Sequence, residues 1–481
     1  MNGPPTPEKT ERSRGQGLVA RTAPVHRPLV KVVQLGRSVA KPPKALGVGG
    51  VVIGFLIIIV IGTVLLSLPV AREPGTEWSL LTSLFTSVSA VCVTGLEVTD
   101  TSEYWSTFGH AVILGLIQAG GIGVMTSSML ILILLGRPIS LRDRFLVREM
   151  AGIVPIRSVG GLVIVIIIAT VLLELAGGAF FWYRLHERYD LAQPIWQAAF
   201  HSVSSFNNAG FEIFREGDSL TTFAFDPAFL MVTAVLIIFG GFGMLLLLDV
   251  ISKRRWRVLT LSTRLVLLTS FALLLFGFVS VFIFEYNNPA TLGGMTIQNK
   301  AANAFFHSAD TRTAGFASIS MAESNEETQF AKIALMYIGG ATGSTAGGIK
   351  VTTFVVLVLA TIVAVRGFEH ISIFGRRIGH RTVYRALSVA ALFALVIFVA
   401  TFILIITEPF QFRQVLFEVV SALSNVGLSL GITADLSLAG KFTVIVLMFV
   451  GRLGPLTLAY MLAQRARERM YEAPEANVAI G

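Results

Sequence analysis

The sequence predicts an all-α membrane protein in which four repeats, each with two membrane-spanning helices around a re-entrant pore loop, surround one ion pore in a pseudo-fourfold arrangement. Two observations lead to this fold. Hydrophobic residues make up 54% of the 481 residues and charged residues only 14%, whereas soluble domains carry about 25% charged residues. In addition, a short amphipathic segment that ends in glycine recurs four times, and such regular repetition is typical of a repeated architecture.

The four segments read FTSVSAVCVTG, FHSVSSFNNAG, FFHSADTRTAG and FEVVSALSNVG, and they end at Gly95, Gly210, Gly315 and Gly427. Their glycines are 115, 105 and 112 residues apart. Each segment is too short to cross a bilayer, so we expect it to enter part way and return as extended chain. Such backbone is tolerated at membrane depth only where it is buried in protein or faces water.

Eight apolar runs long enough to cross a bilayer follow one another in the chain. They lie at about 46–70, 109–135, 158–183, 224–251, 259–285, 331–365, 384–407 and 439–464. Paired around the four short segments, they predict four repeats between two tails. The predicted domains are a flexible cytoplasmic tail at 1–45, repeats at 46–136, 158–252, 259–365 and 384–465, and a cytoplasmic tail at 466–481.

The basic residues orient the chain. The loops and tails on one side of the predicted spans hold 27 Lys and Arg residues, and those on the other side hold seven. The positive-inside rule therefore predicts that both termini are cytoplasmic. Because the charges are dispersed among short loops, they favour anionic lipid headgroups over nucleic acid as a partner.

The four glycine segments are the predicted cation filter. Their carbonyls would replace the hydration shell of an ion, and the short helices would aim their partially negative C-terminal ends at the axis. Glycine permits positive φ and adds no side chain to the pore. For a single glycine, a helix cap or packing contact is the simpler interpretation, but four matched positions favour the filter. The adjacent carbonyls predicted as ligands are those of Val93, Thr94, Asn208, Ala209, Thr313, Ala314, Asn425 and Val426.

A glycine cluster follows each filter glycine after 25, 30, 24 or 24 residues. The clusters of the first two repeats are interpreted as close helix packing. The third reads GGATGSTAGGIK at 339–350, and because each glycine costs about 1 kcal/mol inside a helix, we expect the helix to break there into a gate loop. A phosphate-binding loop is disfavoured because the Walker spacing is absent. The predicted gate residues are Gly339, Gly340, Gly343, Ser344, Thr345, Gly347, Gly348, Lys350 and Arg452.

Two charged features at membrane depth carry their own predictions. Arg452 replaces a glycine of the fourth cluster, and a guanidinium at that depth usually faces the bundle interior. It could repel cations below the filter, hold the gate loop by hydrogen bonds to its carbonyls, or form a structural ion pair. Asp310 and Arg312 are expected to pair with each other and brace the third loop, because buried charges need partners.

Together these motifs resemble the Trk/Ktr/HKT superfamily of potassium transporters, and most closely the membrane subunit (KtrB) of bacterial Ktr systems, over about residues 46–465. The resemblance rests on SAVCVTGLEV, SSFNNAGFEIF, DTRTAGF, SNVGLSLG, QAGGIGVMT, GGATGSTAGGIK and GRLGPLT. It implies potassium uptake by a homodimer in the bacterial plasma membrane, with one pore per subunit. It also implies a cytoplasmic KtrA-type ring of regulatory subunits that moves the gate loop.

The resemblance further implies no covalently bound cofactor. Potassium would occupy the filter, and a nucleotide (ATP/ADP or NADH) is expected only on the regulatory partner. Within the superfamily, a serine in place of the first filter glycine accompanies sodium selectivity, so Gly95 implies potassium. A sodium-permeable or sodium-dependent transporter of the same fold is the alternative.

Two other classes of protein are less consistent with the sequence. Solute carriers with alternating access usually contain inverted repeats, whereas these four repeats run in the same direction. An intramembrane enzyme would need a nucleophile with its base or a metal-binding cluster, and no HExxH or CxxC motif is present. The sequence therefore predicts that the protein is not an enzyme. Cys92 is the only cysteine, so no intrachain disulfide can form.

Overall fold

The computed structural model describes residues 3, 48–135, 159–189, 193–214 and 219–454. The chain divides into two units, Met1–Lys44 and Ala45–Gly481, and the helices and strands of the described residues all belong to the second unit. The predicted tails therefore lie outside the described residues, apart from Gly3.

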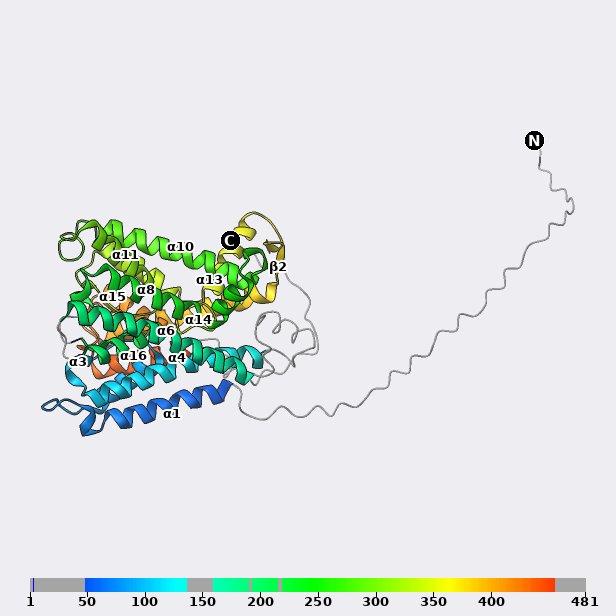
Figure 1. The fold of residues 1–481 in the computed structure, drawn as a ribbon. Helices are drawn as coiled ribbons and strands as arrows, with labels where there is room; N and C mark the ends of the chain where they lie inside the picture. Colours follow the sequence, from blue (N-terminus) through cyan, green and yellow to red (C-terminus); the bar gives the residue numbers. More distant parts are fainter. Residues whose placement is uncertain (1–2, 4–47, 136–158, 190–192, 215–218, 455–481) are drawn as a thin grey trace. The chain divides into compact units, whose positions relative to one another are not determined.

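Three helices form the framework of each predicted repeat: a long helix, a short helix that leads to a filter segment, and a further helix that is broken in two of the repeats. In the first two repeats the helices are α1 (Val48–Leu66), α2 (Leu80–Cys92), α3 (Thr101–Tyr104), α4 (Thr107–Leu135), α6 (Val159–Arg188), α7 (Pro194–Asn207), α8 (Pro227–Phe242) and α9 (Met244–Lys253). In the last two they are α10 (Leu261–Phe284), α11 (Ile297–Asp310), α12 (Glu326–Tyr337), α13 (Val351–Val365), α14 (His380–Thr407), α15 (Phe412–Ser424) and α16 (Leu438–Leu453). The axes of the long helices α1, α4 and α10 are roughly aligned with one another (Figure 1).

Smaller elements join the helices. Short 3₁₀ turns occur at Pro69–Ala71, Thr221–Phe223 and Trp256–Val258. A two-stranded antiparallel hairpin of β1 (Ile371–Ile373) and β2 (Arg376–Ile378) lies between α13 and α14, with Ile371 opposite Ile378. The fold is thus mostly helical, and the hairpin departs from the all-helical expectation.

The same packing device positions the short helix in three of the repeats. A serine of the short helix donates a hydrogen bond of 2.6 to 2.8 Å to a carbonyl of the preceding long helix: Ser87 to Ile59, Ser202 to Glu174 and Ser308 to Leu274. A glycine one turn further along the long helix leaves room for the serine hydroxyl, since an added Cβ would lie 2.5 to 2.6 Å from it at Gly62, Gly177 and Gly277. Small residues allow such close helix contacts, so these glycines fix the depth of the short helices.

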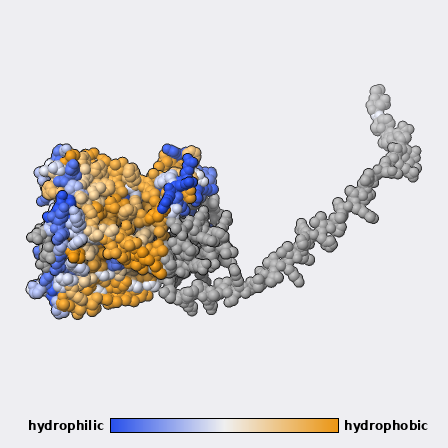
Figure 2. Space-filling model, viewed as in Figure 1, coloured by the Kyte–Doolittle hydropathy of each residue, from blue (hydrophilic) through white to orange (hydrophobic). Residues whose placement is uncertain are grey.

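The helices expose a broad hydrophobic band, bordered by hydrophilic residues (Figure 2). Among the described residues, four helical stretches are each long and apolar enough to cross a membrane: Thr107–Thr126, Ile164–Arg188, α10 and α14. The bent pair of α8 and α9 would be a fifth. The count of eight spans stays a prediction, because α1 and α13 are shorter, α12 and α13 are separated, and α16 is described only to Leu453.

Two of the helices break beside the predicted gate. The axes of α8 and α9 differ by 93° across Gly243, which has φ +72°. The helix of the third repeat ends at Tyr337 and resumes at Val351, so the break expected in the glycine-rich run is present. Only a residue without a side chain adopts the Gly243 conformation without strain, which explains a sharp elbow at that point.

Candidate ion filter and gate

All four predicted filter segments share an unusual backbone conformation. The residue two positions before each glycine has a positive φ: +55° at Val93, +60° at Asn208, +137° at Thr313 and +50° at Asn425. Positive φ is uncommon outside glycine, and for a β-branched valine it is a genuine outlier. Such conformations persist only where the surrounding structure holds them, and they cluster at functional sites.

The four filter glycines form a closed ring. Each of them lies against the carbonyl oxygen of the residue that precedes the next glycine. An added Cβ would meet the oxygen of Ala209 at Gly95, of Ala314 at Gly210, of Val426 at Gly315 and of Thr94 at Gly427. This order returns to its starting point, so the four segments surround a common centre with one carbonyl between each adjacent pair.

The ring carbonyls have no hydrogen-bond partner in the described parts of the chain, although each of these residues is buried. The backbone amides of the filter, in contrast, do have partners. The Ser89 and Ser421 hydroxyls each accept a hydrogen bond of 3.1 Å from the amide of the filter glycine in their own segment. In the third segment, the Asp310 carboxylate accepts from the Phe316 amide at 2.7 Å. Buried carbonyls are normally paired. Those without partners among the described residues belong to Val93, Thr94, Asn208, Ala209, Thr313, Ala314, Asn425 and Val426.

Side chains also link neighbouring segments of the ring. The Asn425 amide donates to the Thr94 hydroxyl at 2.9 Å and to the Met448 carbonyl at 2.8 Å. The Asn208 amide group and the Thr313 hydroxyl form the corresponding bond, also 2.9 Å long, between the second and third segments. These bonds join the segments in pairs and resist widening of the ring.

The glycine clusters let the later helices approach the ends of the short helices. An added Cβ would collide with the carbonyl of Val91 at Gly120, of Phe206 at Gly240 and of Leu423 at Gly451. Each of these carbonyls belongs to the residue four positions before a filter glycine. The packing interpretation is thus confirmed at Gly120 and Gly240, whereas Gly243 of the second cluster forms the elbow. In the third repeat Gly339 instead faces the Gly347 carbonyl of its own loop.

The two ends of loop 339–350 are bonded to each other. We call this point, formed by Tyr337, Gly339 and Ile349, the neck of the loop. The Gly339 amide donates to the Ile349 carbonyl at 3.0 Å, and the Ile349 amide donates to the Tyr337 carbonyl at 3.1 Å. Gly348 has a φ of +65°, and its Cα lies close to Gly339. Within the loop, the Ser344 hydroxyl donates to the Ala341 carbonyl at 2.7 Å. These contacts give the glycine-rich run a defined, folded shape.

The body of the loop contacts the two repeats on either side of its own. Gly343 packs on the elbow at Gly243. The Ala341 amide donates a hydrogen bond of 2.9 Å to the Gly241 carbonyl, and Gly340 lies against the same oxygen. On the other side, Gly347 abuts the Ser424 carbonyl at the end of α15. The loop thus reaches from the second repeat to the fourth.

Thr345 bridges these two repeats by itself. Its amide donates to the Gly240 carbonyl at 3.4 Å, and its carbonyl accepts a hydrogen bond from the Arg452 guanidinium. The second and fourth filter segments are not neighbours in the ring order. Thr345 therefore joins the helices that follow two non-adjacent filter segments.

Two cations, Arg452 and Lys350, bind the loop. Arg452 is 7% exposed and forms no ion pair with any described residue, so among the three interpretations of Arg452 the geometry favours a hydrogen bond to the loop. The Lys350 ammonium donates to the Ala346 carbonyl at 2.6 Å. Both cations bind carbonyls of the loop and keep it folded.

The expected pair of Asp310 and Arg312 is wrong. The Asp310 carboxylate turns toward the amide of Phe316, whereas the Arg312 guanidinium donates to the Ser270 hydroxyl and to the Gly339 carbonyl, both at 3.2 Å. Because α11 ends at Asp310, the backbone turns between the two residues and their side chains diverge. Arg312 therefore braces the neck of the loop.

Sequence reasoning also missed the elbow at Gly243 and the serines behind the filter. Ser89 and Ser421 stand at the same place, six residues before a filter glycine, and Ser204 shares this position. This recurrence was the available signal for the serines. Gly243 carried no comparable signal, because its cluster resembles the packing cluster of the first repeat.

A bundle of apolar helices around a ring of buried carbonyls is typical of membrane proteins that transport cations. The chain belongs to the TrkH family of cation transport proteins, which it matches over residues 47–470. The family consists of transporters, in agreement with the prediction that the protein is not an enzyme.

Individual relatives are similar over most of their length. The Ktr system potassium uptake protein B of Bacillus subtilis is 40% identical, with 88% of this chain and 93% of the relative covered. The Vibrio alginolyticus protein of the same description is 38% identical over 90% of this chain and 94% of the relative. The crystal structure of the potassium transporter TrkH from Vibrio parahaemolyticus matches with a TM-score of 0.67 at 23% identity, covering 85% of this chain and 84% of that one. This last likeness concerns the fold alone.

Proposed function

We propose that this protein takes up potassium ions through a selectivity filter formed by the ring of four glycines, with loop 339–350 as its gate. In this proposal eight transmembrane helices surround the pore in a pseudo-fourfold arrangement. The observation that carries it is the closed ring of buried carbonyls without hydrogen-bond partners among the described residues. Carbonyl oxygens that face a common centre replace the water of a cation.

The choice of potassium is supported by the relatives and by Gly95. The Bacillus and Vibrio proteins are described as potassium uptake proteins, and the first filter position here is glycine. The second candidate is a transporter that also passes sodium. It is supported by the Enterococcus hirae protein described as a potassium/sodium uptake protein, which is 35% identical over 89% of this chain and 96% of the relative.

The gate assignment is supported by Thr345, which lies between helices from two non-adjacent repeats. A loop held across the centre of the bundle by carbonyl hydrogen bonds would obstruct an ion leaving the filter. Its glycines allow it to change shape. Opening then requires that the bond from Arg452 to the Thr345 carbonyl be broken.

The assembly we propose is a homodimer in the bacterial plasma membrane, with both termini in the cytoplasm and a nucleotide-binding regulatory ring beneath the gate. The word "system" in the descriptions of the Ktr relatives supports a partner subunit. The excess of basic residues on one side of the predicted spans supports the orientation.

The test is ion flux into proteoliposomes containing the purified protein, measured separately with potassium, sodium and an uncharged solute. Potassium should enter fastest, and Gly210→Ala should abolish most of that flux, because the new Cβ would lie 2.5 Å from the Ala314 carbonyl oxygen. The matched control is Gly115→Ala in α4, where an added Cβ meets nothing within 4 Å. Equal flux of potassium and sodium would favour the second candidate, and solute uptake would refute both.

A further inference from the structure

Arg312 stands apart from its counterparts in the other filter segments. The residues at the same position, three before the filter glycine, are Cys92, Asn207 and Ser424, none of which is basic. The Arg312 side chain is buried, with 8% of the residue exposed. A buried guanidinium requires compensation, so its contacts indicate what it is there to hold.

The contacts of Arg312 are all to neutral groups. One guanidinium nitrogen, Nη2, donates both to the Ser270 hydroxyl of α10 and to the Gly339 carbonyl, while Nε is buried without a partner among the described residues. In the described parts of the chain no carboxylate forms an ion pair with it. Within those parts, the Gly339 carbonyl is therefore one of only two acceptors that stabilise this charge.

The second acceptor belongs to the neck of the gate loop, not to the filter. Gly339 is the first residue of the loop, and its amide is bonded to Ile349 at the other end. Arg312 itself lies three residues before Gly315 of the ring. One side chain thus connects the filter backbone to the point at which the loop is anchored.

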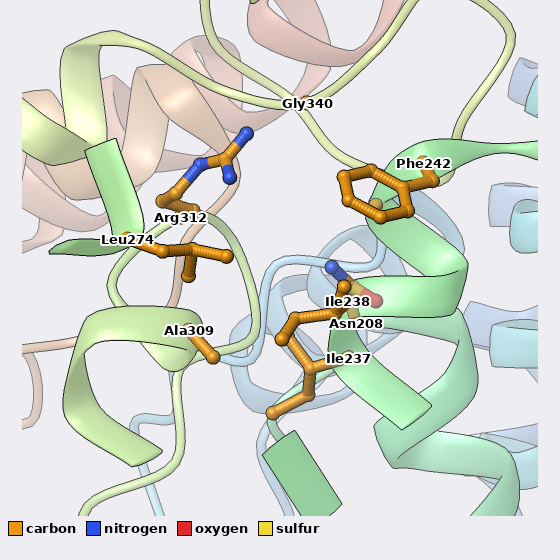
Figure 3. A pocket seen from close by; sticks show the side chains of 9 residues that line it. Asn208, Ile237, Ile238, Phe242, Leu274, Ala309, Arg312 and Gly340 are labelled. Carbon is orange, nitrogen blue, oxygen red and sulfur yellow. The ribbon is translucent and has the colours of Figure 1, made fainter. Parts of the chain in front are cut away.

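A small cavity lies beside the neck. It has a volume of about 10 Å³ and is lined among others by Arg312, Gly340, Asn208 and Phe242 (Figure 3). A cavity of this size has room for about one water molecule. Figure 3 shows the Arg312 guanidinium directed toward the loop at Gly340, with Asn208 of the neighbouring filter segment across the cavity.

We propose that Arg312 is a tether that couples the third filter segment to the gate loop, so that ion occupancy of the ring and displacement of the loop depend on each other. This inference rests on the proposed filter and gate. If the neck moves away, Arg312 loses an acceptor that it needs while buried, and the strain passes to the filter backbone. By thermodynamic reciprocity, an ion that orders the filter also resists displacement of the loop.

The experiment follows loop displacement with a cysteine at Thr345, whose buried hydroxyl has no partner among the described residues. The full chain carrying Thr345→Cys is placed in lipid nanodiscs, and its modification by a methanethiosulfonate reagent is timed in high potassium or in choline. Potassium should slow modification at least about fivefold, at the lower end of typical coupling. The wild-type chain, with only buried Cys92, gives the background rate.

Adding Arg312→Gln should abolish the potassium effect, whereas Arg312→Lys, which keeps a charged donor, should retain part of it. Ser270→Ala is the matched control, because it removes the other acceptor and leaves the Gly339 bond; it should keep the potassium effect. Arg452→Gln should speed modification in both solutions and preserve the ratio. If Arg312→Gln does not fold, as judged by size-exclusion chromatography and melting, Arg312→Lys decides: an undiminished potassium effect in it would overturn the tether.

The outcomes separate the tether from the proposed function. A potassium effect that persists in Arg312→Gln would overturn the tether and leave the filter and gate intact. The absence of any potassium effect in the reporter protein would also overturn the tether. If Arg452→Gln then failed to speed modification as well, the gate assignment itself would be wrong.

Discussion

At the scale of single residues, the four filter glycines matter because each has both a positive φ and a neighbouring carbonyl where a side chain would go. The four positions could be singled out in the sequence, because the repeats align them without any knowledge of side-chain directions; that they form a filter stays a proposal. The partner of Arg312 could not be predicted in this way. Its neighbour Asp310 is close in sequence but faces elsewhere, and only the path of the chain after α11 brings the Gly339 carbonyl to it.

The first prediction concerns selectivity. Gly95→Ser should raise sodium flux relative to potassium, because its Cβ would collide with the Ala209 carbonyl oxygen and displace one wall of the ring. The measurement is the ratio of potassium to sodium flux in proteoliposomes. Gly54→Ser in α1 is the control, since an added Cβ there meets nothing within 4 Å. An unchanged ratio in Gly95→Ser would argue against Gly95 as part of the filter.

The second prediction concerns the stability of the second repeat. Arg184 donates two hydrogen bonds of 2.8 Å to the Asp226 carboxylate, which also caps the start of α8. Asp226→Asn removes the charge that balances Arg184 and should lower the free energy of unfolding by about 2–3 kcal/mol. The measurement is thermal or denaturant unfolding of the detergent-solubilised protein. Glu326→Gln is the control, because its ion pair with Arg413 is exposed and should contribute less than about 1 kcal/mol.

The same pair gives the protein a defined pH dependence. Burial acts to raise the pKa of the Asp226 carboxyl, but its hydrogen bonds with Arg184 hold that pKa below the ordinary value. A lowered native pKa stabilises the fold above the unfolded pKa of about 3.9, and the stabilisation is lost as the pH falls through the native value. The difference in stability between wild type and Asp226→Asn should therefore shrink below about pH 4. A difference that stayed constant to lower pH would contradict this assignment.

At the scale of elements, the break between α12 and α13 followed from composition, because a helix interior does not accommodate so many glycines. The contacts that the resulting loop makes could not be predicted from composition. They depend on the elbow between α8 and α9 and on the end of α15, which belong to other repeats. The small hairpin of β1 and β2 was also missed, since its short strands lie in a loop that was interpreted only for its charge.

The third prediction concerns the gate. Shortening loop 339–350, or replacing Arg452 by alanine, should raise potassium uptake per folded protein, because either change removes the hydrogen bond that holds Thr345 across the bundle. Uptake is measured together with the amount of protein that elutes as a folded species. Reduced uptake in a normally folded loop variant would defeat the gate assignment and leave the filter intact.

At the scale of the whole molecule, the hydrophobic band and the family membership describe a membrane transporter. Four matched segments recur in the sequence and predict four repeats, and the arrangement of eight spanning helices stays a prediction. The arrangement of the segments in a ring was an expectation that only contacts between distant residues could support, such as Asn425 with Thr94. Dimerisation and partner binding depend on surfaces beyond a single chain.

The fourth prediction concerns the regulatory partner. If loop 339–350 is the gate, the protein alone should transport slowly and without response to nucleotide, since Arg452, Arg312 and Lys350 all donate hydrogen bonds to carbonyls of the loop. Adding a soluble ring of nucleotide-binding subunits from a Ktr system should make uptake responsive to nucleotide. The comparison is proteoliposome flux with and without that ring. Full nucleotide-responsive uptake by the isolated protein would contradict this prediction.

The central claim is that the ring carbonyls bind the transported cation, and the position of the ion tests it most directly. Crystals of the protein grown with rubidium in place of potassium allow the ion to be located by anomalous scattering. The signal is predicted at the centre of the ring, within coordinating distance of the carbonyl oxygens of Thr94, Ala209, Ala314 and Val426. A preparation that takes up rubidium but shows no rubidium signal in the ring would contradict the claim.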